Sequence, residues 1–62
     1  MKISNDDVHY LNGLLDAFEG FSDGAWMQAC QDAIHDCGRF KGKDPYEVWL
    51  AWVRATGVEA KP

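Results

Sequence analysis

Two acid-x-x-His pairs offer the most direct metal chemistry in the sequence: Asp6 with His9, and Asp32 with His35. This spacing puts both side chains of a pair on one helical face, as in the Glu-x-x-His pairs of di-metal helical bundles. The direction is unfavourable, because Asp32 and His35 fall opposite the apolar stripe of their segment. His9 likewise lies about 100° from Val8 around a helix. We therefore interpret both pairs as solvated polar faces, and predict no metal site and no cofactor.

The two cysteines, Cys30 and Cys37, are the other candidates for reactive groups. A helix would separate their Cα atoms by about 10.5 Å, which is too far for a disulfide between them. Both lie on an apolar stripe, where a cysteine usually acts as a small buried hydrophobe. We therefore expect inert free thiols, which are typical of a reducing compartment, and predict a cytoplasmic location.

No catalytic constellation emerges from the remaining polar residues. The two serines, Ser4 and Ser22, stand at helix-capping positions, and the sequence has neither a glycine-rich phosphate loop nor a nucleophile elbow. A domain of 62 residues also has little room for a pocket that encloses a substrate. These features predict a protein that is not an enzyme.

Residues 38–43, GRFKGK, form the only basic stretch. The cations Arg39, Lys41 and Lys43, with Phe40 among them, match in composition a small phosphate-plus-stacking patch for single-stranded nucleic acid. The formal net charge of −4 works against attraction to a polyanion. A nucleic-acid-binding module that uses loop 38–43 therefore stays the alternative function.

The charge of the chain is unevenly distributed. Residues 1–36 carry one lysine against seven acidic residues, whereas residues 37–62 carry five basic residues against three acidic ones. Binding phosphate needs concentrated positive charge, so the acidic first half disfavours nucleic acid as the main partner. We expect an acidic surface that attracts a basic protein and sets its orientation. Its residues are Asp16, Glu19, Asp32 and Asp36.

The elements that must position these residues are helices, and the last one, over 45–56, is the best specified. Asp44 and Pro45 are typical of a helix start, and Gly57 is typical of a left-handed stop. Its apolar residues form two stripes on nearly opposite sides. The first stripe is Tyr46, Trp49, Leu50 and Val53, and the second is Val48, Ala51, Trp52 and Ala55. A short chain has few elements to cover both, so we expect Val48, Trp52 and Ala55 to bind a partner.

Helical periodicity also predicts helices over 4–19 and 23–37, with Gly20 and Gly38 as their stops. Three helices in one domain over 1–62, with loop 38–43 and a short tail at 58–62, predict an all-α, up-down-up three-helix bundle. Homodimerisation would complete this fold by covering the second stripe. The expected core is Leu11, Leu15, Phe18, Trp26, Cys30, Ala33, Trp49 and Val53.

Composition supports a globular protein, since 47% of the residues are hydrophobic and 26% are charged. No apolar run approaches the roughly 20 residues of a transmembrane helix, so we expect no membrane contact. We predict a small acidic module that docks on a larger macromolecule through a protein interface and adapts or inhibits it. In general style it is similar to accessory proteins of phages and other mobile elements. A purely structural homo-oligomer is a further alternative, because it would use the same stripe.

Overall fold

The computed structural model describes residues 2–58. Its elements are helix α1 at Asn5–Leu15, a short 3-10 turn η1 at Asp16–Phe18, helix α2 at Asp23–Asp36 and helix α3 at Pro45–Thr56. This part of the chain contains no strand, so the all-α prediction is confirmed. None of the helices within it is long and apolar enough to cross a bilayer. Beyond Val58, the predicted tail 58–62 lies outside the described residues.

Local capping explains where two of the helices begin. At α1, the Ser4 hydroxyl accepts the Asp7 N–H at 3.1 Å, and the Ser4 N–H donates to Asp7 Oδ2 at 3.3 Å. This reciprocal capping box satisfies donors that the first helical turn would leave free. At α3, which begins at Pro45, the Asp44 carboxylate accepts the Tyr46 N–H at 3.2 Å. Both N-caps therefore form as the sequence predicts.

The glycine stops are confirmed at two of three positions. Gly57 and Gly38 take positive φ angles of 71° and 79°, the left-handed geometry of a helix end. Gly20 does not adopt a positive φ. The first helix ends differently because α1 tightens into η1 after Leu15, and the Phe21 N–H then donates to the Phe18 carbonyl at 3.0 Å. The predicted left-handed stop at Gly20 is therefore wrong.

The core contains every residue that the sequence predicts for it and several more. Leu11, Leu15, Cys30 and Trp49 are buried, and the other four predicted residues are partly buried against the same cluster. The residues that the prediction left out are buried as well: Ile34, Phe40, Val48, Ala51 and Trp52. Two tryptophans of α3 belong to this core, and Trp26 of α2 packs against them. The Trp26 ring centroid lies 5.5 Å from that of Trp49 and 6.3 Å from that of Trp52.

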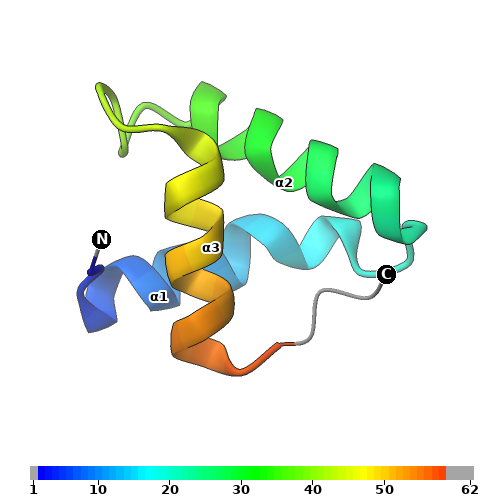
Figure 1. The fold of residues 1–62 in the computed structure, drawn as a ribbon, viewed down its shortest axis with the longest axis horizontal. Helices are drawn as coiled ribbons and strands as arrows, with labels where there is room; N and C mark the ends of the chain where they lie inside the picture. The colour runs from blue at the N-terminus through cyan, green and yellow to red at the C-terminus, as the bar shows by residue number, and fades with distance from the viewer. Residues whose placement is uncertain (1, 59–62) are drawn as a thin grey trace.

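Figure 1 shows the arrangement of the helices. Helices α1 and α2 run in opposite directions, and α3 crosses both of them. The predicted up-down-up order thus describes the reversal between the first two helices better than the position of the third. A crossing helix contacts two neighbours along one length, and α3 packs on both α1 and α2. The chain extends over 26 × 23 × 18 Å.

Gly13 provides a test of the local account of α1. It lies in the helix interior, and a Cβ atom built there would meet nothing within 4 Å. Gly13→Ala should therefore stabilise the fold by about 0.5–1 kcal/mol, because alanine loses less backbone entropy on folding. Gly57→Ala, at a φ of 71°, should destabilise it by about 1 kcal/mol. Urea denaturation followed by circular dichroism would measure both, and a destabilised Gly13→Ala would contradict the structure.

Candidate partner-binding groove

A groove of about 340 Å³ opens beside the end of α1, between α2 and α3. We call it the acidic groove, and its lining residues are Asn12, Leu15, Asp16, Glu19, Trp26, Trp52 and Val58. Leucine, valine and the two indoles supply its apolar surface, whereas the Asp16 and Glu19 side chains are exposed to solvent. Ligand sites of roughly 300 Å³ are at the small end of their range. The acidic groove therefore suits one or two side chains of a partner.

The turn at the end of α1 brings the two carboxylates together. Asp16 is the first residue of η1, and Glu19 follows its last residue and donates its N–H to the Asp16 carbonyl at 3.2 Å. Residues three apart in a 3-10 turn lie one above the other. Asp16 and Glu19 thus line the same side of the groove, as the expected acidic surface requires.

A long-range hydrogen bond holds the other side of the groove. The Trp52 indole N–H donates to Asn12 Oδ1 at 3.0 Å and so joins α3 to α1. Trp26 packs against the ring of Trp52 from α2. Both indoles are therefore held in place by contacts within the chain, and the lining residues outside helical elements are Glu19 and Val58.

The predicted apolar contact surface on α3 needs correction. Val48 is fully buried and Trp52 is 6% exposed, so neither presents a free face to a partner. Both belong to the core cluster, which α1, α2 and the buried ring of Phe40 share. Of the three residues predicted for this surface, only Ala55 is exposed. The short chain covers both stripes of α3 because that helix crosses its neighbours.

The four predicted acidic residues do not form one surface. Asp16 and Glu19 line the acidic groove, whereas Asp32 and Asp36 do not. On the exposed side of α2, Asp32 accepts the Gln28 amide at 2.9 Å, and Asp36 Oδ1 lies 3.1 Å from His35 Nδ1. The second pair of acids is therefore a solvated helix face, and only the first pair adjoins an apolar surface.

Trp52→Glu separates a core role for this residue from an interface role. A carboxylate at this buried position would be left without a partner, and the cost of about 4 kcal/mol or more approaches the whole stability of a small domain. We expect the variant to lose its helical circular dichroism signal at room temperature. For Ala55→Glu, on the exposed side of the same helix, the free energy of unfolding should lie within about 0.5 kcal/mol of that of the native chain. A folded, soluble Trp52→Glu variant would show that this residue serves an interface instead.

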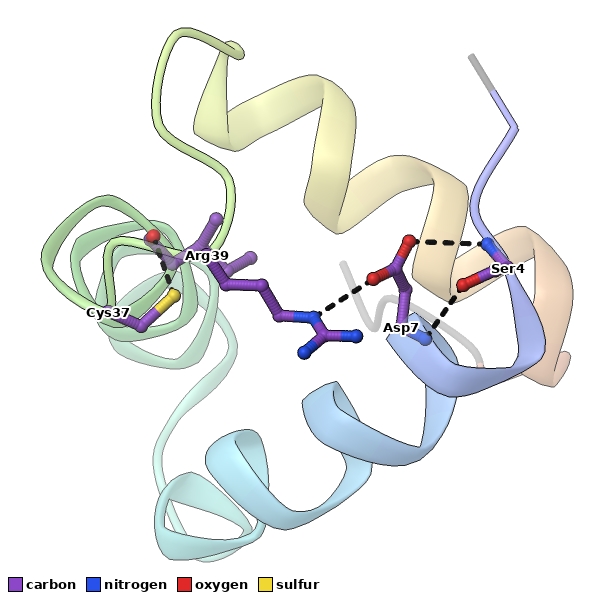
Figure 2. A network of polar contacts seen from close by, with 5 residues as sticks. Ser4, Asp7, Cys37 and Arg39 are labelled. Atoms are coloured by element: carbon purple, nitrogen blue, oxygen red, sulfur yellow. Dashed lines mark hydrogen bonds and ion pairs between the residues drawn. The ribbon is translucent and has the colours of Figure 1, made fainter.

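The predicted basic patch in residues 38–43 is engaged in holding the loop. Arg39 donates from Nε to Asp7 Oδ1 at 2.9 Å, and its guanidinium carbon lies 4.7 Å from the centre of the Tyr10 ring. Figure 2 shows this side chain reaching from the loop toward the capping box of α1. Phe40 is 6% exposed and packs edge-on to Tyr10. The Arg39 guanidinium is thus paired with Asp7 although it is exposed, and the Phe40 ring is buried and not free for stacking.

Lys41 and Lys43 are the remaining residues of the proposed phosphate site, and both are exposed. Two lysines without the arginine or the aromatic ring supply point charges only. The phosphate-plus-stacking interpretation of the loop is correspondingly weaker.

The Asp7–Arg39 contact makes a pH-dependent contribution to stability. The hydrogen bond from Arg39, followed by that from the Ser4 backbone, lowers the pKa of Asp7 below its usual 3.8. A carboxyl group whose pKa is lowered in the folded state stabilises the fold at pH values above its unfolded pKa. This stabilisation is lost as the pH falls through the folded pKa. Asp7→Asn should therefore be less stable than the native chain at pH 7, with a gap that closes as the pH falls below 3.8. Urea midpoints across this range would measure it, and Asp36→Asn is the control outside the network.

The thiols and histidines form no site. Burial raises the pKa of Cys30 to about 11, against the smaller opposite effect of the nearby Trp49 indole N–H. That N–H has no nitrogen or oxygen partner within the described residues. The Cys37 thiol donates to the Ile34 carbonyl at 3.1 Å, and both thiols are free. Across residues 2–58, no three side chains of histidine, cysteine, aspartate or glutamate gather to hold a metal ion.

A second groove, of about 300 Å³, lies at the other end of α1. We call it the basic groove, and its lining residues are Lys2, Ile3, Ala51, Arg54 and Ala55. Lys2 and Arg54 are exposed, and neither takes part in an ion pair with another described residue. Arg54 lies in the last turn of α3. Nothing in the periodicity indicates that Lys2 and Ile3 pack beside it, because that contact depends on how α1 meets α3.

Comparisons with protein-family models, with curated proteins and with solved structures find no match. The function is therefore inferred from the geometry and the charge of the two grooves.

Proposed function

We propose that this protein is a small, acidic, non-enzymatic protein-binding module that uses the acidic groove to dock on a larger macromolecule. One observation carries the proposal: Asp16 and Glu19 stand beside an apolar surface formed mainly by Trp26 and Val58, since Leu15 and Trp52 are only 3% and 6% exposed. Lysine and arginine side chains combine a charge with apolar surface, because the lysine ammonium ends an apolar stem and the arginine guanidinium has a planar face. A basic side chain of a partner would therefore pack its apolar stem against Trp26 and Val58 and pair its charge with the carboxylates.

The rest of the molecule fits a binding role. The residues that line the two grooves include no histidine, cysteine or serine, the usual nucleophiles and bases. The acidic character of the first half speeds encounter with a basic surface and fixes orientation. The proposed consequence for the partner is adaptation or inhibition, since an acidic protein can occupy a surface that otherwise meets a polyanion. The free thiols suit the cytoplasm, and the proposed setting is an accessory role in a phage or another mobile element.

The test is a titration with a fluorescently labelled peptide of arginine and leucine residues, followed by anisotropy. Asp16→Asn with Glu19→Gln removes both groove carboxylates and should weaken binding about three- to tenfold, as expected for two partly exposed ion pairs. Asp32→Asn with Asp36→Asn makes the same change in net charge outside the groove and should change the affinity less than about twofold.

Two results would contradict the proposal. Equal losses in both double variants would show that only net charge attracts the peptide. Native protein that fails to bind the peptide at all would remove the groove as a docking site. If binding behaves as expected, a tagged chain and its groove variant can be compared for the macromolecule that co-purifies with the native chain only.

A further inference from the structure

The acidic and basic grooves complement each other. Each is a small depression with an apolar surface, and each carries two charges of one sign: Asp16 and Glu19 in the first, Lys2 and Arg54 in the second. The chain as a whole is acidic, but Lys2 and Arg54 place two cations beside apolar residues, and neither forms an ion pair with another described residue. Positive charge beside an apolar surface is what the acidic groove requires of a partner.

The two grooves are separate and can be filled at the same time. They share no lining residue. Lys2 and Ile3 precede the first turn of α1, whereas Asn12 to Glu19 span its end, and the 11 residues between those ends extend about 16 Å at helical rise. A contact between unlike patches of identical chains closes as a two-fold dimer where both patches lie in one interface, and otherwise builds rings or open chains.

From this we infer that a second copy of this chain docks head-to-tail in the acidic groove and supplies Lys2 and Arg54 as the basic partner. The inference rests on the proposed function, because it identifies one partner of the same groove. Ile3 and Ala55 of the incoming copy face Trp26 and Val58 of the receiving copy, and the four charges pair at the rim. In an open assembly the terminal copy keeps a free acidic groove. Self-association and docking on another macromolecule therefore compete for one surface.

Net repulsion between two acidic copies does not prevent this contact. The smallest extent of the chain is 18 Å, so the centres of two touching copies lie at least about that far apart. That distance is more than two Debye lengths at about 0.15 M salt, where the Debye length is roughly 8 Å. Opposite charges in the docked grooves lie within contact distance and are screened far less. Salt thus suppresses the repulsion between the net charges of the two copies more than the attraction between the opposite charges in contact.

A charge-swap experiment tests the inference. The acidic-groove variant is Asp16→Lys with Glu19→Lys, and the basic-groove variant is Lys2→Glu with Arg54→Glu. Sedimentation from micromolar to millimolar concentration at about 0.15 M salt should show the native 7.0 kDa chain associating, with dissociation at about 1 M salt. Each variant alone has like charges in both grooves and should stay monomeric. An equimolar mixture should associate again, because each groove then meets its opposite.

Controls and contrary results are specific. Asp32→Lys with Asp36→Lys changes the net charge equally outside the groove and should associate as the native chain does. All variants must keep the native circular dichroism spectrum. Swapped variants that associate alone would overturn the inference, as would a native chain that stays monomeric. In the latter case, binding of the arginine-leucine peptide leaves the proposed function standing, whereas no binding removes both. If the inference holds, that peptide should also dissolve the native assembly.

Discussion

The tryptophan cluster is the interaction on which the rest of the structure depends. Trp26 of α2 contacts Trp49 and Trp52 of α3, and these two rings belong to different stripes of that helix. Trp49 and Trp52 are nevertheless three positions apart and therefore neighbours on one side of α3, and the Trp26 indole contacts both of them. Aromatic side chains bury a large area each, and a chain of 62 residues has few other ways to remove that much apolar surface from water. This shared contact holds α3 against α2.

Local signals in the sequence predict what depends on neighbouring residues. Ser4 with Asp7 and Asp44 with Pro45 cap their helices because each cap needs only three or four consecutive residues. The core stripe is also recognisable from periodicity alone. The end of α1 was missed, since Gly20 resembles a stop although the chain had already tightened four residues earlier.

Long-range contacts are what the sequence could not supply. Val48 and Trp52 were expected to face a partner because periodicity finds two stripes on α3 without saying which element covers each. Phe40 sits between cations in a glycine-flanked loop, and its burial depends on the distant Asp7 and Tyr10 that hold Arg39. The same limit applies to the grooves. Charge indicated Asp16 and Glu19, whereas the apolar surface beside them exists only once the helices cross.

The hydrogen bond between Asn12 and Trp52 has a consequence for how the chain is made. It joins residues 40 positions apart, and the Asp7–Arg39 contact joins residues 32 positions apart. During synthesis, which proceeds at about 5–20 residues per second, α1 therefore exists for seconds before its partners on α3 have been added. An isolated helix of 11 residues is marginal in water, so α1 depends on the later helices for its stability. The tertiary contacts of α1 are therefore completed only when α3 has been added.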